Sequence, residues 1–424
     1  MNLLREFLSR YNISSCLVAF SGGADSLCLL LDLLKCQKIH PLRIEVAHVD
    51  HGWRKESEQE AAFLASWVES LPLPFHQKRL SWDGLKGNLE EMSRDARYQF
   101  FREVCQERGL QGVMVAHHQG DLAETTLKRF LEGASFLKLS AMQPVSIHHG
   151  IPIWRPFLSR SRKEIENLVR SAPIQPLQDP TNRDVRFLRS RLRHVILPHL
   201  AQQFGKEIQQ GIVAIAEEAT ELTGYFRERF ALLLAKSVSG PLGRWANWQQ
   251  NLPFTHLEIR YLLRFFLESA NVTLSREILH RAALGLMREE AGLSFPFREG
   301  ALYIDRRQVF LLNAAARMTS SVIFSSPLKK PLAWGPFVLQ TGSTHSLCLW
   351  QGQLPIHLAP GEYRVGIPDR DALFVPTNKP LKSWWNKHRV PVCLRTLFPV
   401  VWKENRIVHE FLVPWLRHST SPSS

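Results

Sequence analysis

A glycine-containing turn between an apolar run and a helix-length segment constrains this chain more than any other feature. Residues 16–20 read CLVAF, a buried-strand pattern, and residues 21–26 read SGGADS before a helical pattern over Ser26–Lys35. Glycines directly after a strand let backbone N–H groups approach an anion, and the following helix adds its positive N-terminal dipole. Because the turn holds no lysine, it is not a G-x-x-x-x-G-K-[ST] loop. It therefore predicts a phosphate-binding loop made of Ser21, Gly22, Gly23, Ala24, Asp25 and Ser26.

Strand-like and helix-like segments alternate along the first 200 residues. A second β-rich run, Arg43–Val49, precedes a helical pattern over Ser57–Leu71, and an amphipathic segment spans Asn88–Gly109. A third apolar run, Gly112–Ala116, leads into a helical pattern over Asp121–Gly133. This alternation predicts an α/β fold in which helices cover both faces of a parallel, doubly wound sheet. Ligands of such sheets bind beyond the carboxyl ends of the strands, where the glycine turn lies.

The sequence pattern changes twice after residue 200. Two helical patterns, Gln202–Phe230 and Leu257–Met287, dominate residues 201–315. From about residue 320 to residue 416, short β-like runs separated by glycine and proline predict a small mixed α/β domain. We therefore expect three domains, 1–200, 201–315 and 320–416, which suits a chain of 424 residues.

The composition favours a polyanionic partner and argues against sites built from cysteines. The chain carries 53 Lys and Arg against 39 Asp and Glu, a net charge of +14 that favours a polyanionic partner such as nucleic acid. No apolar run is long enough to cross a bilayer, and the N-terminus lacks the pattern of a secretory signal. The six cysteines form no C-x-x-C pair, which argues against a zinc site, an iron–sulfur site and a disulfide framework.

Several further segments occur in a characteristic order with the glycine turn. They read AHVDHGWR at 47–54, LEEMSRDARYQFF at 89–101, VAHHQGDLAET at 115–125, LSAM at 139–142, RPF at 155–157, LQDPTNRDVRFLRSRLRHVILP at 177–198 and LKSWWNKHRVPVCL at 381–394. With the turn, this series resembles the tRNA(Ile)-lysidine synthetases, members of the N-type ATP pyrophosphatases whose glycine turn is called the PP-loop. The resemblance is densest over residues 15–200. Gly120 departs from the pattern, because the family usually has Asp at that position.

The resemblance implies a fold, a reaction and partners. The N-terminal domain would be a Rossmann-like PP-loop ATPase that uses ATP and Mg²⁺. ATP would adenylate the C2 oxygen of the wobble cytidine, position 34, in a CAU-anticodon tRNA(Ile), and free L-lysine would then displace AMP. The products would be lysidine, AMP and pyrophosphate, and the codon read would change from AUG to AUA and the charging from Met to Ile. The resemblance also implies a cytoplasmic enzyme that is a monomer or a homodimer.

Residue chemistry and the resemblance together single out candidate catalytic groups. Asp121 and Glu124 are three residues apart at a predicted helix start, so both carboxylates face the same way and are expected to hold Mg²⁺ with Asp25. The alternative is that Asp121, and likewise Asp25, only caps a helix. His117 is a candidate donor to the leaving phosphate, and Arg97 a candidate phosphate or substrate contact. The predicted catalytic residues are Asp25, Arg97, His117, Asp121 and Glu124, and the predicted metal ligands are Asp25, Asp121 and Glu124.

Further candidates come from the end of the second strand and from two basic segments. Arg189 and Arg193 are four residues apart on one predicted helical face, and guanidinium groups bind phosphate bidentately. His48 ends the second strand, where such folds hold adenine or ribose, whereas His118 is interpreted as a structural residue. Near the C-terminus, cations alternate with aromatic side chains, which suits stacking on unpaired bases. The predicted ATP contacts outside the loop are His48, Arg189 and Arg193, and the predicted tRNA contacts are Lys379, Lys382, Trp384, Trp385, Lys387 and Arg389.

Two classes of alternative remain open from the sequence. The first is another PP-loop enzyme, such as a tRNA 2-thiolase or an NAD, GMP or asparagine synthetase. The thiolases need thiols near the site, whereas this chain has no C-x-x-C pair, and the synthetases need a glutaminase or partner module that is not visible. The second is a tRNA-binding protein that has lost catalysis, which Gly120 favours and the intact glycine turn opposes.

Overall fold

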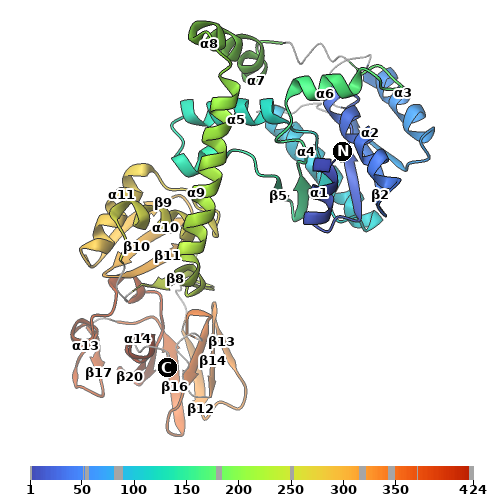
Figure 1. Ribbon diagram of the computed structural model, residues 1–424. Coiled ribbons are helices and arrows are strands. Elements are labelled where there is room, and N and C mark those ends of the chain that lie inside the picture. The colour runs from blue at the N-terminus through green and yellow to red at the C-terminus, as the bar shows by residue number, and fades with distance from the viewer. Residues whose placement is uncertain are drawn as a thin grey trace. The chain divides into compact units, whose positions relative to one another are not determined.

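The computed structural model divides into two compact units, Met1–Thr223 and Gly224–Ser424 (Figure 1). It describes residues 2–50, 52, 57–80, 89–177, 184–248, 253–314, 321–341, 349–369 and 371–419. None of the helices in these ranges combines the length and the apolar character that a bilayer crossing requires. The expected division into three domains stays a prediction.

A six-stranded sheet forms the centre of the first unit. Its strand order is β3-β2-β1-β4-β6-β5, and every neighbouring pair is parallel except β5 with β6, which is antiparallel at the edge. The predicted parallel sheet is therefore confirmed, with one added antiparallel edge strand. The strands are β1 (Ser15–Ala19), β2 (Arg43–Asp50), β3 (Phe75–Arg79), β4 (Val113–Met114), β5 (Val145–His148) and β6 (Ile151–Trp154).

Helices pack on both faces of this sheet. Alternate residues of β1 point to opposite faces, so Val18 joins an apolar cluster with α2 and α6 while Leu17 joins another with α4. Leu30 of α2 and Phe101 of α4 are buried in these two clusters. The helices are α1 (Asn2–Arg10), α2 (Ala24–Gln37), α3 (Ser57–Glu69), α4 (Leu89–Arg108), α5 (Gln119–Leu131) and α6 (Arg162–Val169), with a 3-10 turn, η1 (Phe136–Ser140).

Several strands and helix ends differ from the sequence predictions. Strand β3 reads FHQKR and went unpredicted because, as the sheet's other edge strand, it is only half-buried and lacks an apolar run. The run predicted as Gly112–Ala116 pairs as a strand over two residues only. Helix α5 begins at Gln119, two residues before the predicted start, because His118 caps it.

A chain of short helices follows α6 in the first unit. These are α7 (Leu188–Arg191), a π-helical turn η3 (Leu192–Ile196) and α8 (Leu197–Phe204). The single helix predicted over Gln202–Phe230 is in fact the end of α8 and a separate helix, α9 (Gln209–Ala235), which crosses the boundary between the units. The predicted helix is interrupted at Gly205, which ends α8 in the left-handed conformation at φ 63°.

The second unit begins with helices and an antiparallel sheet of order β7-β8-β11-β10-β9. The segment predicted as one helix over Leu257–Met287 is two helices, α10 (His256–Glu268) and α11 (Arg276–Met287). Thr255 and Ser275 cap them, which explains the break. Sequence analysis missed β7, β8 and β9. The strands are β7 (Val238–Gly240), β8 (Gly243–Asn247), β9 (Leu293–Phe297), β10 (Gly300–Asp305) and β11 (Gln308–Asn313).

The remainder of the second unit is mixed α/β, as predicted. A six-stranded sheet has the order β12-β16-β19-β20-β17-β18, and a three-stranded sheet the order β13-β14-β15. Trp245 of β8 packs against Trp350 and Trp415, so one apolar core joins the antiparallel sheet to this part of the chain. The elements are β12 (Val322–Ser326), β13 (Leu332–Trp334), β14 (Phe337–Thr341), β15 (Gln353–Ile356), β16 (Gly361–Gly366), β17 (Leu373–Phe374), β18 (Lys379–Pro380), α13 (Leu381–Lys387), η4 (Val392–Leu394), β19 (Val400–Lys403), β20 (Arg406–Glu410) and α14 (Leu412–Ser419).

Candidate active site

A cavity of about 420 Å³ opens at the carboxyl ends of β1, β2 and β4 in the first unit. This is the edge at which ligands bind in parallel sheets. The glycine turn lies on its wall together with most of the candidate catalytic side chains. The sequence-predicted residues that line it are Ser21, Gly23, Asp25, Ser26, His48, Arg97, His117 and Asp121.

The glycine turn has the backbone geometry of an anion-binding loop. Gly22 has φ +78°, a backbone conformation that favours glycine, and a Cβ atom there would also lie 2.8 Å from Leu177 Cδ1. Gly23 is the N-cap of α2 and no side chain caps the helix. Ser26 Oγ donates to the Gly23 carbonyl at 3.0 Å and accepts from the Ser21 N–H at 3.2 Å. The first turn of α2 therefore presents backbone N–H groups that no side chain caps.

Asp25 does not cap α2, so the capping alternative is wrong for this residue. Its side chain is 43% exposed, and it makes no hydrogen bond within the described part of the chain. His118 Nε2 lies 4.0 Å from Asp25 Oδ1. Partial burial raises the pKa of Asp25 above its ordinary value. The carboxylate keeps its oxygens available beside the phosphate loop.

His117 is a neutral hydrogen-bond donor in this cavity. Burial lowers its pKa to about 3, and the attraction of Asp121 for the protonated form does not offset that effect. Arg155 Nε donates to His117 Nδ1 at 3.3 Å, so the ring proton is on Nε2. An imidazole in this state can donate a hydrogen bond to a phosphate oxygen, but it cannot supply a proton as a general acid near neutral pH.

We expect the imidazole of His117 to stay neutral from pH 8 down to pH 5, which ¹⁵N NMR of the histidine rings would show with His117→Asn as the assignment control. Because the unfolded chain takes up this proton near the ordinary pKa and the folded chain only near pH 3, the folded state loses stability as the pH falls between those values. A ring that titrates near pH 6.5 in the folded protein would contradict this assignment.

Asp121 and Glu124 are held by the two arginines that sequence analysis assigned to ATP. Arg189 Nη2 and Arg193 Nη2 both donate to Asp121 Oδ1, each at 2.7 Å. Arg189 Nε donates to Glu124 Oε2 at 3.1 Å, and Arg193 donates to both oxygens of Glu124. The two carboxylates are 6% and 3% exposed. We call these four residues the acid–arginine cluster.

Electrostatics within the acid–arginine cluster strongly favours its charged form. Burial alone would raise the pKa of Asp121, but Arg189 and Arg193 hold it well below the ordinary range. Asp121 Oδ2 also accepts a hydrogen bond from the backbone N–H of His118 at 2.9 Å, so Asp121 does cap α5. With both carboxylates neutralised by guanidinium groups, Asp121 and Glu124 do not fit the role of Mg²⁺ ligands in this arrangement. Asp25 does fit it, because its oxygens are free of hydrogen bonds among the described residues.

Comparisons with known proteins agree with this geometry. Residues 2–200 match the PP-loop domain family. The tRNA(Ile)-lysidine synthase of Protochlamydia amoebophila is 36% identical, in an alignment that covers 97% of this chain and 92% of the relative. The chain belongs to the tRNA(Ile)-lysidine synthase family. The synthase of Chlamydia muridarum is 35% identical over 64% of this chain and 84% of its own length. A U34-tRNA thiolase from Methanococcus maripaludis, 15% identical with a TM-score of 0.43 over 52% of this chain and 78% of its own, is too distant to bear on the argument.

The departure at Gly120 from the pattern of the lysidine synthase family has a local explanation. His118 Nδ1 accepts from the Gly120 N–H at 2.9 Å, and the imidazole packs over the glycine. A Cβ atom at position 120 would lie 2.7 Å from His118 Cε1, so any side chain there displaces the ring. The structural interpretation of His118 is confirmed, since it is the buried N-cap of α5.

Two other predicted contacts of the lysidine synthase site lie on the cavity wall. His48 Nδ1 contacts the Phe20 carbonyl oxygen at 2.9 Å, and burial lowers its pKa, so the ring is neutral and held by the backbone. Arg97 packs its guanidinium 5.5 Å from the centre of the Tyr98 ring. Within the described residues Arg97 has no ion pair or hydrogen bond, which leaves its donors available to an anionic ligand. The motif positions His51, Trp53, Arg54 and Asp179–Asn182 lie outside the described residues.

The predicted tRNA contacts form two sets in the second unit. Lys379, Lys382, Lys387 and Arg389 are exposed on β18, α13 and the turn that follows. Trp385 is 1% exposed, and its indole N–H donates to Glu410 Oε2 at 3.1 Å. Trp384 Nε1 donates to the other Glu410 oxygen at 3.2 Å, and its ring packs 4.0 Å from that of His388. Trp385 is a core residue with no face for stacking on a base, and it leaves the proposed set of tRNA contacts.

Sequence analysis missed Arg155 and Tyr98 as parts of this site. Arg155 fixes the tautomer of His117, and Tyr98 lines the cavity beside Arg97. Both residues lie in segments that carry the family resemblance, Tyr98 in 89–101 and Arg155 in 155–157, but neither was assigned a role at the site.

Proposed function

We propose that this chain is a tRNA(Ile)-lysidine synthase, which uses ATP to join lysine to C2 of the wobble cytidine in a CAU-anticodon tRNA(Ile). The observation that carries the proposal is an intact phosphate-binding loop on the wall of the cavity, in a chain related along 97% of its length to a lysidine synthase. The substrates are ATP, the tRNA and free L-lysine, and the products are lysidine, AMP and pyrophosphate. Since these substrates occur in the cytoplasm, we place the reaction there, by a monomer or a homodimer.

The first chemical step in this proposal forms a bond from the cytidine C2 oxygen to the α-phosphorus of ATP and breaks the bond to the β-phosphate. Negative charge grows on the departing pyrophosphate. The uncapped N–H groups of the α2 first turn and the Ser21 hydroxyl are placed to donate hydrogen bonds to the pyrophosphate oxygens. Arg97 adds a positive charge and His117 a hydrogen bond from Nε2.

The second step forms the carbon–nitrogen bond. The lysine ε-amine, in its unprotonated form, attacks C2, the C2–O bond breaks, AMP leaves, and the new nitrogen releases a proton to water. His117 is a poor acceptor for that proton because of its low pKa. Asp25 is the carboxylate at the cavity whose oxygens are not already bonded within the described residues. When bound, Mg²⁺ would neutralise phosphate charge, and Asp25 is the residue we propose to hold it.

Thiol chemistry has no support at this site. None of the described cysteines lines the cavity, and burial raises the pKa of both Cys16 and Cys105 to about 12. This argues against the alternative of a 2-thiolase that works through its own cysteines.

The test of the proposed function is nucleoside mass analysis. A CAU-anticodon tRNA(Ile) transcript is incubated with the full chain, ATP and isotope-labelled lysine, then digested to nucleosides. We expect a labelled lysine adduct of cytidine, with AMP and pyrophosphate released in equal amounts. Release of ADP, or an unaltered cytidine in a preparation that binds both ATP and tRNA, would contradict the proposal.

Removing three exposed cations near the C-terminus is expected to weaken tRNA binding. In Lys382→Ala/Lys387→Ala/Arg389→Ala, the dependence of log affinity on log salt should become shallower by about 2 to 3, since each phosphate contact contributes roughly 0.7 to 0.9. Binding of ATP should not change. The matched control, Arg298→Ala/Lys329→Ala/Lys330→Ala, removes three exposed cations elsewhere in the same unit. Equal salt slopes for both triple variants would remove the α13 region from the RNA interface.

A further inference from the structure

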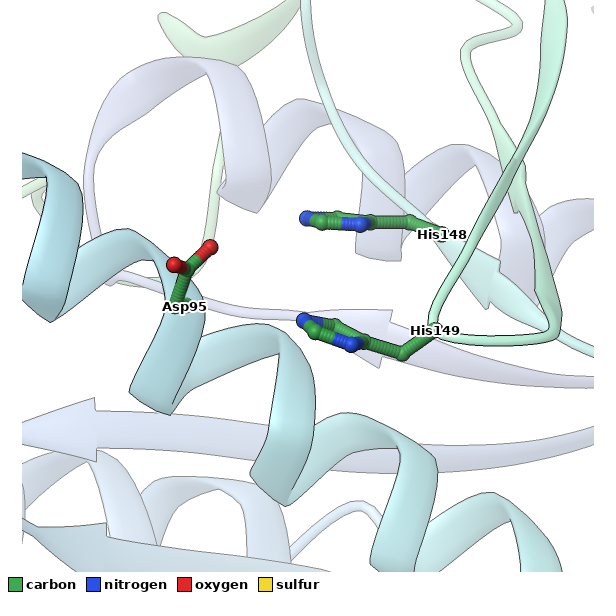
Figure 2. A group of neighbouring side chains, drawn as sticks. All are labelled: Asp95, His148 and His149. Atoms are coloured by element: carbon green, nitrogen blue, oxygen red, sulfur yellow. The ribbon is translucent and has the colours of Figure 1, made fainter. Parts of the chain in front are cut away.

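A group of three side chains with metal-ligand chemistry lies outside the cavity. Asp95 projects from α4, His148 from the end of β5, and His149 from the turn between β5 and β6 (Figure 2). One ligand atom from each lies within 4.8 Å of the other two. Figure 2 shows both imidazoles directed from the hairpin toward the Asp95 carboxylate. None of the three lines the cavity that holds the phosphate loop.

We propose that Asp95, His148 and His149 form a binding site for a divalent transition metal, of which Zn²⁺ is the best match. Two imidazoles and one carboxylate are ligands that Zn²⁺ accepts, and three protein ligands leave a position for water. This is the one group of three potential ligands with such spacing among the described residues. The lack of a C-x-x-C pair argued only against a zinc site with cysteine ligands, and this site has none.

The backbone of the hairpin holds the two histidines in place. His148 pairs with Ile151, so His149 and Gly150 form a two-residue turn, with φ of 49° and 81°. Two positive φ angles are what a type I′ turn needs, and the backbone twist of that turn matches the twist of the two strands it joins. His148 also packs its ring 4.3 Å from that of Tyr98, while His149 stacks on His148 at 4.4 Å. The hairpin therefore presents the two imidazoles together.

Only modest side-chain movement is needed to close the site on an ion. Bonds of about 2.0 to 2.1 Å in a tetrahedral site place ligand atoms about 3.3 Å apart, and the present ligand atoms already lie within 4.8 Å of one another. Asp95 and His149 are exposed, so their side chains can move without displacing packed neighbours. The Asp95 carboxylate has no hydrogen bond or ion pair with any described residue.

A metal at this position would join α4 to the β5–β6 hairpin. Both elements carry groups of the active site, since α4 supplies Arg97 and the hairpin holds Arg155. Arg155 Nη1 donates to Ser146 Oγ at 2.9 Å, and Arg155 Nε donates to His117. The ion would therefore hold α4 and the β5–β6 hairpin together beside the active site, and it takes no part in the chemistry.

Zinc titration of the full chain tests the proposal. Zn²⁺ is added in competition with a chromophoric chelator to the wild type, Asp95→Asn and His149→Asn. The His149→Asn change keeps the hairpin, because asparagine followed by glycine is the preferred type I′ pair. We expect the wild type to bind one more ion than either variant, with an affinity loss above the roughly 100-fold that removal of an outer-shell partner can cost.

A matched control and a second measurement separate the possible outcomes. His256→Asn removes one ring of another histidine pair, His256 and His280, whose ring centres are 4.5 Å apart in the second unit; it should leave zinc stoichiometry unchanged. Added Zn²⁺ should also slow amide exchange in α4 and the β5–β6 hairpin of the wild type but not of His149→Asn. Equal zinc binding by wild type and His149→Asn overturns the proposal. So does a loss of tRNA affinity in metal-free His149→Asn with zinc binding intact, which would assign the pair to RNA.

Discussion

Replacing Asp25 by asparagine is expected to lower kcat/KM for lysidine formation by about 10³-fold, the upper range for losing one preorganised electrostatic group. The carboxylate borders the phosphate loop with both oxygens free of hydrogen bonds among the described residues. Asparagine keeps the size of the side chain but has no negative charge to hold Mg²⁺ beside the phosphates. Steady-state kinetics with saturating tRNA and lysine would measure the loss, and the Mg²⁺ concentration for half-maximal rate should rise.

Binding of tRNA is the internal control for Asp25→Asn, because the residue serves phosphate and metal. Its affinity should match that of the wild type. Glu107→Gln, which neutralises an exposed carboxylate on α4 in the same unit, should retain full activity. Wild-type turnover by Asp25→Asn at ordinary Mg²⁺ concentrations would remove the carboxylate from the mechanism.

Local sequence patterns were enough to predict the phosphate loop and the sheet that carries it. The turn depends on Gly22 and Gly23, and the two contacts that fix it are made by Ser21 and Ser26 within the same six residues. The parallel sheet followed from apolar strands alternating with helices. These features could be predicted because each is encoded within a few consecutive residues.

The partners of the acid–arginine cluster could not be predicted in the same way. Arg189 and Arg193 have the spacing of phosphate ligands, and Asp121 and Glu124 that of metal ligands. The structure brings these pairs together across 65 to 72 residues of chain, where each neutralises the other. The spacing of residues within one segment does not show which distant segment carries the opposite charge. The sequence therefore predicted phosphate as the partner of the two arginines and Mg²⁺ as the partner of the two carboxylates. Trp385 was misjudged for a related reason, because its partner Glu410 lies 25 residues away.

Replacing Arg193 by methionine is expected to destabilise the first unit by about 3 kcal/mol, the lower end of the range for breaking a buried ion pair. Arg193 is 26% exposed and bonds to both carboxylates, while Glu124 is 3% exposed. Methionine fills similar space but leaves two buried carboxylates with Arg189 alone. Hydrogen exchange of the α5 amides would report this loss for the first unit by itself.

The double variant Glu124→Leu/Arg193→Met distinguishes lost charge balance from lost packing. It restores one carboxylate, Asp121, to one guanidinium, Arg189, so it should recover most of the stability that Arg193→Met loses. The pH dependence of the stability difference between wild type and Arg193→Met is a second test of the same charge effect. Because the arginines hold the pKa of Asp121 below its ordinary value, the stability they add is present above the ordinary carboxyl range and is lost as the pH falls below it. The gap between wild type and Arg193→Met should therefore close below about pH 4. A double variant as unstable as the sum of the single changes, with a gap independent of pH, would mean that the cluster acts through packing and not through charge.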